Sequence, residues 1–164
     1  MSVSTDTQVL LIEDDPNDVE LALIAFRRSK LVDKIEVAHD GEEALDWLFA
    51  RGTFAGRNLT APPQLILLDL KLPKISGIEV LKVLKADART RAIPVVALTS
   101  SKQQQDLVAC YQLGVNSYIQ KPMDFSEFQR TIHDLGHYWL RINQSPPPEA
   151  YIEGDGRAVL PPPA

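Results

Sequence analysis

Leu65-Ile66-Leu67-Leu68-Asp69-Leu70-Lys71-Leu72-Pro73 is the stretch that decides the fold of this chain. A short run of four apolar residues followed by turn residues is typical of a strand buried on both faces, as in a parallel sheet. Asp69 leaves this run at its C-terminal end. Open α/β sheets bind their ligands beyond the carboxyl ends of their strands. Asp69 is therefore the first candidate site residue.

Three other short apolar runs also end in residues that carry chemistry. The run at 9–12 is followed by acids, the run at 95–98 by a hydroxyl, and the run around 118–119 by an ammonium group. The residues after these runs are Glu13, Asp14 and Asp15, then Thr99, then Lys121 and Pro122. Because parallel strands end at one edge of a sheet, we expect these groups to lie near Asp69.

The spacing between the runs predicts the architecture. Stretches with helical periodicity separate the runs, which is the pattern of βα units. Five such units predict an α/β fold: a doubly wound, five-stranded parallel sheet flanked by five helices. A strand is expected at 35–38. The first helix is expected at about 16–29, because Asp15 and Pro16 suit its cap and first position.

Capping patterns predict the other helices. An acceptor residue followed three positions later by Glu opens three of them: Asp40 with Glu43, Ser76 with Glu79, and Asp124 with Glu127. Gly52 is expected to end the second helix, and the fourth is expected from about Ser101 to Gly114. The fifth carries an apolar stripe that continues to Ile142.

Composition limits the functions of the chain. Its 164 residues carry a net charge of −5 and a single cysteine. This charge argues against nucleic acid as a partner, and the apolar runs are too short to span a membrane. One unpaired cysteine suits the reducing cytoplasm. We expect one folded domain at 7–143 and a Pro-rich tail at 144–164 that is extended or disordered.

The acids indicate a cation site. Carboxylates gathered at one edge repel one another unless protons, a cation or an ammonium offset their charge. Oxygen ligands suit Mg²⁺, or alternatively Mn²⁺, rather than zinc. A cation beside Asp69, with a lysine and a hydroxyl, suggests phosphoryl transfer with Asp69 as the nucleophile. Asp15 is interpreted as a helix cap rather than a ligand.

The ordered motifs resemble those of receiver domains from the response regulators of two-component signalling. The resemblance covers about residues 7–142 and implies a flavodoxin-like fold of the receiver type. The motifs are LLIEDD at 10–15, LLDLKLP at 67–73 with Ser76 and Gly77, ALTS at 97–100, and YIQKP at 118–122. Each motif alone is weak evidence, but their order is highly specific.

The resemblance implies that Asp69 accepts a phosphoryl group from a phosphohistidine on a partner histidine kinase. Asp14 would bind magnesium directly, Glu13 through water, and the Lys71 backbone carbonyl would complete the metal site. Thr99 and Lys121 would bind phosphoryl oxygens, and Tyr118 would be the aromatic switch. Ser100 and Pro122 complete this predicted phosphate-binding and switch group, with a cis peptide between Lys121 and Pro122.

A long loop at 51–63 and the aromatic ending around Trp139 are similar to stand-alone regulators paired with bacterial and cyanobacterial phytochromes. This similarity implies a bacteriophytochrome-type kinase as the partner and signalling through changed protein contacts. Trp139 and Ile142 either complete the core or, with Tyr138, form a homodimer surface.

Two alternatives to a phosphorylation switch remain at this point. A magnesium-dependent phosphatase of the haloacid dehalogenase kind would need a second Asp at position 71, where this chain has Lys71. A receiver-shaped scaffold that is never phosphorylated would not need the acids, Thr99 and Lys121. The predicted protein is thus a phosphoacceptor rather than an enzyme. His133 and His137 have the spacing of zinc ligands but lack an evident third ligand.

Overall fold

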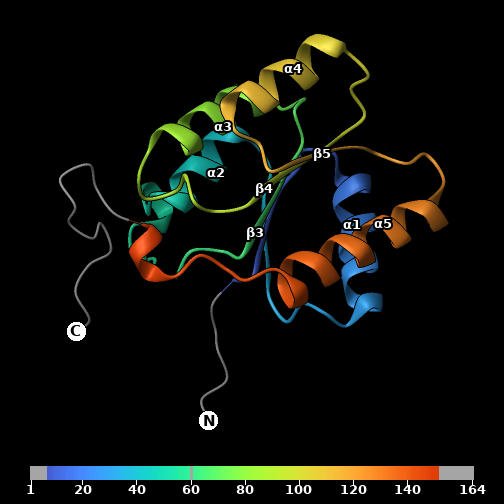
Figure 1. The fold of residues 1–164 in the computed structure, drawn as a ribbon, viewed down its shortest axis with the longest axis horizontal. Helices are drawn as coiled ribbons and strands as arrows, with labels where there is room; N and C mark the ends of the chain where they lie inside the picture. Colours follow the sequence, from blue (N-terminus) through green and yellow to red (C-terminus); the bar gives the residue numbers. More distant parts are fainter. Residues whose placement is uncertain (1–6, 60, 152–164) are drawn as a thin grey trace.

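The computed structural model describes residues 7–59 and 61–151, which form one parallel sheet covered by helices on both faces (Figure 1). The sheet has the order β2-β1-β3-β4-β5. Its strands are β1 (Val9–Ile12), β2 (Ile35–Ala38), β3 (Leu65–Leu68), β4 (Val95–Thr99) and β5 (Ser117–Gln120). The predicted doubly wound α/β fold is confirmed.

The strand register brings the carboxyl ends of the central strands to one level. Ile12 of β1 lies beside Leu68 of β3, and Leu68 lies beside Ala97 of β4. Every residue of β1, β3 and β4 is buried. Burial on both faces explains why these strands read as continuous apolar runs. The residues that follow them emerge together at one edge of the sheet.

Five helices cover the sheet in two layers (Figure 1). The helices α1 and α5 pack together on one face, and α2, α3 and α4 lie on the other. Their bounds are α1 (Pro16–Ser29), α2 (Gly41–Leu48), α3 (Gly77–Ala86), α4 (Gln104–Leu113) and α5 (Phe125–His137). Each layer closes its own hydrophobic cluster against the sheet.

Four helices begin where the capping patterns predict. The side chains of Asp15, Asp40, Ser76 and Asp124 accept hydrogen bonds from backbone N–H groups of the first turns of α1, α2, α3 and α5. Such bonds satisfy N–H groups that have no partner within the helix. The predicted bounds of the first helix and of the strand at 35–38 are also confirmed.

The second helix ends earlier than predicted. It stops at Leu48, and Gly52 instead begins a 3-10 turn, Gly52–Phe54, with a positive φ of 57°. The Arg57 side chain donates to the carbonyls of Trp47 at 2.5 Å and Leu48 at 3.0 Å. Arg57 thus supplies donors to the carbonyl groups at the C-terminal end of α2. It lies in the following loop, where the sequence has no periodicity that would predict this contact.

The fifth helix continues into a π-helical turn and a tail that folds back on the domain. The turn Tyr138–Ile142 is closed by a bond from the Asn143 N–H to the Tyr138 carbonyl at 2.7 Å. The chain then crosses beneath the sheet to the layer of α2 (Figure 1), where Tyr151 is 4% exposed. Tyr151 is buried and Ala150 is partly buried, whereas most of the residues at 144–149 are exposed, so the extended or disordered tail stays a prediction. Residues 152–164 lie outside the described part.

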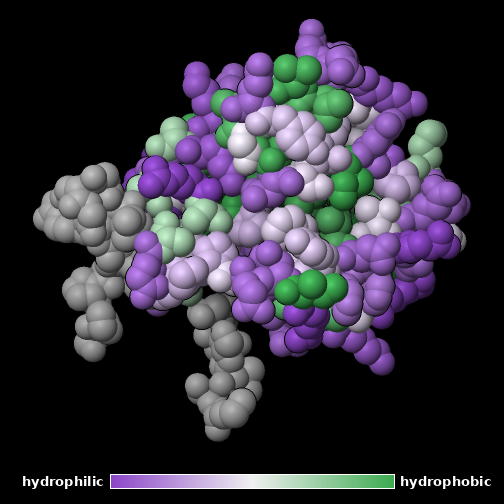
Figure 2. Space-filling model, viewed as in Figure 1, coloured by the Kyte–Doolittle hydropathy of each residue, from purple (hydrophilic) through white to green (hydrophobic). Residues whose placement is uncertain are grey.

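Among the residues described, no helix combines the length and apolar character needed to cross a bilayer. The visible surface is mostly hydrophilic (Figure 2), in agreement with the net charge of −5. Figure 2 shows a face dominated by hydrophilic residues, with hydrophobic ones gathered over α4 and beside β5.

Candidate functional site

Asp69 lies directly after β3 and is fixed by the backbone on both sides. Its N–H donates to the Ile12 carbonyl at 3.0 Å, and its Oδ1 accepts from the Lys71 N–H at 3.1 Å. Its side chain is 8% exposed. Gly77 packs so closely that a Cβ there would lie 2.2 Å from the Asp69 carbonyl oxygen. The start of α3 therefore holds the Asp69 backbone in place.

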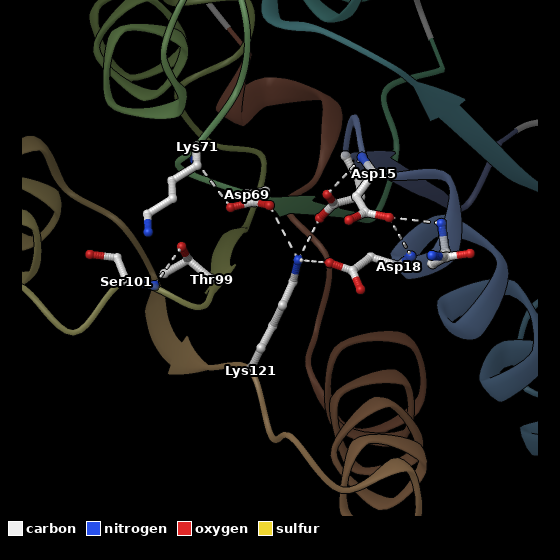
Figure 3. Close-up of polar contacts among 9 residues, drawn as sticks. Asp15, Asp18, Asp69, Lys71, Thr99, Ser101 and Lys121 are labelled. Atoms are coloured by element: carbon white, nitrogen blue, oxygen red, sulfur yellow. Dashed lines mark hydrogen bonds and ion pairs between the residues drawn. The ribbon is translucent and has the colours of Figure 1, made fainter.

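Lys121 brings the acids together (Figure 3). Its Nζ donates to Glu13 Oε2 at 2.6 Å, to Asp18 Oδ2 at 2.9 Å and to Asp69 Oδ2 at 3.2 Å. The Lys121 N–H also donates to the Thr99 carbonyl at 2.8 Å, which fixes the lysine to the end of β4. An ammonium group has three donors, so this one is fully used.

The electrostatics of this cluster follow from burial and crowding. Burial and, after it, the neighbouring Asp69 carboxyl together raise the pKa of Glu13 to about 8, although the Lys121 ammonium acts to lower this pKa. Burial lowers the pKa of Lys121, but its bonds to Asp18 and Glu13 and the charge of Asp69 outweigh this and raise that pKa overall. One charged ammonium therefore faces more negative charge than it can offset.

The acids also form a cation site in outline. Carboxylate oxygens of Glu13, Asp14 and Asp69 all lie within 4.8 Å of one another. Among the described residues, these three form the group that could hold a metal ion. Glu13 and Asp69 are buried while Asp14 is exposed, which leaves the group open to solvent. An all-oxygen donor set with excess negative charge fits Mg²⁺ or Mn²⁺. The ligand role of the Lys71 carbonyl stays a prediction.

Asp15 points its carboxylate elsewhere. Its Oδ1 accepts from the N–H groups of Asn17 at 2.8 Å and Asp18 at 3.3 Å. This confirms its interpretation as the α1 cap. Its own N–H donates to Glu13 Oε1 at 3.1 Å and so helps to orient that acid.

Thr99, the last residue of β4, forms the hydroxyl side of the site. Thr99 is fully buried, and its Oγ1 accepts from the Ser101 N–H at 3.2 Å. The Tyr118 hydroxyl donates to the Ser101 carbonyl at 3.5 Å. Ser100 is exposed, and its role in phosphate binding stays a prediction. Ser101 is thus the serine that joins Thr99 to Tyr118.

The predicted cis peptide between Lys121 and Pro122 is wrong, because the described residues contain no cis peptide bond. The trans isomer is intrinsically favoured even before proline. With the trans bond the Lys121 side chain still contacts all three carboxylates.

Sequence reasoning missed Asp18 as a partner of Lys121. In sequence, Asp18 lies three positions after the Asp15 cap, where an acid is explained by the helix dipole alone. Its contact with Lys121 joins residues that are 103 positions apart, and no local pattern signals it. The two histidines of α5, His133 and His137, stack at 6.3 Å without joining a metal-ligand group among the described residues.

The comparison with known families decides the identity of the fold. Residues 9–133 match the model of the response regulator receiver domain. The chain belongs to this family. A curated relative, the probable methanogenesis regulatory protein FilR2 of Methanothrix harundinacea, is 44% identical over 85% of this chain and 88% of its own length.

Solved structures of receivers are similar throughout the domain. The bacteriophytochrome response regulator RtBRR is 47% identical with a TM-score of 0.69, covering 87% of this chain and 86% of its own. The phosphorylated cyanobacterial phytochrome response regulator RcpA is 34% identical with a TM-score of 0.80, covering 87% and 100%. The Mn²⁺-bound response regulator Rcp1, from Synechocystis, is 32% identical with a TM-score of 0.79, covering 86% and 99%.

Proposed function

We propose that this receiver domain accepts a phosphoryl group on Asp69 from a phosphohistidine of a partner histidine kinase. The observation that carries the proposal is the position of Asp69, buried at the end of β3, bonded to Lys121 and beside Glu13 and Asp14. In the transfer, an Asp69 carboxylate oxygen attacks phosphorus. The P–N bond to the histidine breaks, and the released imidazole nitrogen keeps the electron pair and takes up a proton.

The residues of the site divide the work of holding the new charge. Lys121 can shift a donor from an acid to a phosphoryl oxygen, because it already contacts Asp69 at 3.2 Å. Thr99 can donate its hydroxyl hydrogen, since its Oγ1 serves as an acceptor for the Ser101 N–H. A divalent cation, held by Glu13, Asp14 and Asp69, would offset the charge of the phosphoryl group. The Mn²⁺-bound structure of Rcp1 supports this cofactor class.

We propose that the domain signals through changed contacts with other proteins, from the cytoplasm, where Cys110 would remain a free thiol. The proposed kinase is of the bacteriophytochrome type, because RtBRR and RcpA carry phytochrome in their names. FilR2 is named as a probable methanogenesis regulatory protein, which indicates a different pathway for that relative. Transfer from purified phytochrome-type kinases at least tenfold faster than from other kinases would support the pairing, and equal rates would refute it.

A homodimer is also proposed, through the surface formed by Tyr138, Trp139 and Ile142. Tyr138 and Ile142 are large hydrophobic residues that are 47% and 56% exposed. Trp139 packs partly on the core cluster beside α5, so it joins the surface to the domain. Sedimentation as a monomer at tens of micromolar, with and without a phosphoryl mimic, would refute the dimer.

Asp69→Asn tests the phosphoryl acceptor. Incubation with acetyl phosphate and Mg²⁺ is expected to add one phosphoryl mass to the wild type and none to this variant. Asp15→Asn is the matched control, because asparagine caps a helix as well as aspartate does and Asp15 faces the α1 backbone. The control is expected to label fully. Undiminished labelling of Asp69→Asn would refute the assignment.

The number of phosphate esters hydrolysed per chain distinguishes a phosphatase from a phosphorylation switch. Lys71 cannot serve as the carboxylic acid that such an enzyme needs, so we expect one phosphate per chain and slow loss. Hydrolysis of a small phosphate ester over many cycles would revive the alternative. A scaffold that is never phosphorylated would show no labelling with any donor.

A further inference from the structure

Helices α1 and α5 pack together on one face of the sheet (Figure 1), and a groove lies between them. The groove has a volume of about 310 Å³, which is within the range of small-molecule sites. The C-terminal part of α1 forms one wall and the N-terminal part of α5 forms the other. Among the described residues that line it, none belongs to the acid cluster around Asp69. The groove is therefore a separate candidate site.

Positive charge collects in this groove. Arg28 of α1 and Arg130 and His133 of α5 line it, and none of the described lining residues is an acid. Within the described part of the chain, neither arginine forms an ion pair with a carboxylate. The chain as a whole carries 22 acids against 17 lysines and arginines, so such a concentration of basic groups is not a consequence of composition. Two guanidinium groups that share one groove without a counter-ion attract an anion.

The acids of α5 lie beside this groove rather than in it. Gln129, Arg130 and His133 are three or four positions apart, so they share the face of the helix that lines the groove. Glu127 and Asp134 flank Arg130 on the neighbouring face and are exposed. Neither of them forms an ion pair with Arg130 in the described structure. The Arg130 guanidinium thus remains available to a ligand.

Arg28 reaches from α1 towards the other wall of the groove. Its Cζ lies 5.8 Å from the ring centroid of Phe125, the first residue of α5. The face of an aromatic ring attracts a guanidinium at this distance. The contact restricts the arginine before any ligand binds, so less side-chain entropy is lost on binding. The planar guanidinium can then donate two parallel hydrogen bonds to one oxyanion.

The groove also borders an amide that lacks a partner. Gln129 lines the groove, and its Nε2 is buried without a hydrogen-bond acceptor in the described part of the chain. A buried donor without an acceptor is costly, and native structures contain few of them. The terminal torsion of glutamine is broad, so the amide can turn towards the groove. An oxygen of a ligand bound there is the acceptor that this amide needs.

We propose that the groove between α1 and α5 binds the phosphate group of a small molecule through Arg28, Arg130 and His133. Two guanidinium forks and an amide offer more donors than the two oxygens of one carboxylate can accept in good geometry. A phosphate monoester presents three acceptor oxygens and nearly two negative charges at neutral pH. The proposal goes beyond the proposed phosphorylation of Asp69 and does not rest on it.

Titration of the isotope-labelled full chain with inorganic phosphate, followed by NMR, tests the site. EDTA removes divalent cations, so the acid cluster repels the probe. Constant ionic strength, balanced with sodium chloride, keeps general screening equal. Amide shifts are expected at residues 25–29 and 125–133. Arg28→Gln and Arg130→Gln are each expected to weaken binding about tenfold, because each removes charged hydrogen bonds to the phosphate.

Arg27→Gln is the matched control. It removes the same charge from the exposed position next to Arg28, and Arg27 does not line the groove. We expect it to weaken binding by less than about twofold, because an exposed charge outside the site is screened. Equal weakening by Arg27→Gln and Arg28→Gln would reduce the effect to general charge attraction and overturn the proposal. Shifts confined to residues outside the groove, or no binding at all, would also overturn it.

Two further probes distinguish the source of the phosphate. Tighter binding of glucose 6-phosphate than of inorganic phosphate would support a phosphorylated metabolite as the ligand. Equal binding of the two would support recognition of the phosphate group alone. A hexaglutamate peptide at the same ionic strength tests an acidic protein segment instead. Tighter binding of this peptide than of either phosphate probe would overturn the proposal, because the groove would then be a protein-docking surface.

Discussion

Helices α3 and α4 follow neighbouring strands and lie side by side, yet they are attached to the site in different ways. Helix α3 begins at Gly77, which lies against the Asp69 backbone, and its side chains Val80, Leu81 and Leu84 are buried in the core. Helix α4 begins at a turn held by the hydroxyl of Ser101, and it buries Cys110. Close packing resists small displacements, whereas a hydrogen-bonded turn can exchange partners.

The difference suggests a division of tasks within one layer of the fold. The start of α3 fixes the acceptor, so that the Asp69 carboxylate meets its partners in one geometry. The start of α4 is held by hydrogen bonds of Ser101, which can exchange partners at lower cost than packed side chains can move. The predictions below test this contrast, from the largest expected change to the smallest.

The largest expected difference between α3 and α4 is the loss of unfolding free energy when an apolar side chain of each helix is truncated. Leu84 of α3 is fully buried, so Leu84→Ala should lower the free energy of unfolding by about 2–5 kcal/mol. Val108 of α4 is 45% exposed, and Val108→Ala should change it by less than about 0.5 kcal/mol. Urea denaturation of both variants measures this difference. Equal losses would contradict the view that α4 is weakly anchored.

Gly77→Ala should damage both stability and the site. Its Cβ would lie 2.2 Å from the Asp69 carbonyl oxygen and 2.5 Å from the Leu70 Cα, which are backbone atoms that cannot rotate away. We expect a loss of about 3 kcal/mol in unfolding free energy and weaker Mg²⁺ binding, measured by calorimetry. Gly56→Ala is the matched control, since a Cβ there meets nothing within 4 Å. A tolerated Gly77→Ala would show that α3 can move away from Asp69.

Removal of the caps should show a smaller contrast. Ser76 Oγ accepts from the Glu79 N–H at 3.2 Å, so Ser76→Ala should cost about 1 kcal/mol. Gln103→Ala removes a side chain that does not cap α4 and should cost only a few tenths of a kcal/mol. Thermal unfolding of the two variants provides the comparison. A larger loss for Gln103→Ala would mean that α4 has a cap of its own.

Cys110 gives the mildest test, through pH. Burial raises the pKa of this thiol to about 11, so almost none of it is thiolate at pH 8 and alkylation should be slow. Below pH 9 the thiol is protonated in both folded and unfolded chains and adds no pH dependence. Above pH 9 the unfolded chain loses the proton first, so stability falls as pH rises towards 11. Cys110→Ala should flatten this slope relative to the wild type; an unchanged slope would place the titration elsewhere.

Much of the fold was predictable because its signals are local. The apolar runs, the cap residues Asp15, Asp40, Ser76 and Asp124, and the order of the polar residues after the strands depend only on nearby positions. These features predicted the sheet, four helix starts and the gathering of Glu13, Asp14 and Asp69 with Lys121.

The missed features depend on contacts between distant residues. Asp18 reaches Lys121 across the sheet edge, and Arg57 ends α2 from a loop ten residues later in the sequence. Tyr151 is buried in the hydrophobic cluster that α2 also joins. The Pro-rich composition of the tail does not indicate this contact. The contacts of Ser101 are also not indicated by the sequence, which places this residue near the start of a helix. Its bonds run in two directions, to Thr99 and to Asp106, and composition does not distinguish it from Ser100.

The path of the tail affects how the domain unfolds. The two hydrophobic clusters lie on opposite faces of the sheet, and the chain enters one with Leu135 of α5 and reaches the other with Tyr151. The segment between Leu135 and Tyr151 therefore connects the two layers. Within it, Ser145 Oγ accepts a hydrogen bond from Gln64 Nε2 at 3.4 Å. Release of Tyr151 would loosen the layer that carries α2 as well as the end of α5. Because the two clusters already share the strands of one sheet, the segment adds a second link between the layers, and we expect it to strengthen the cooperativity of unfolding rather than to create it.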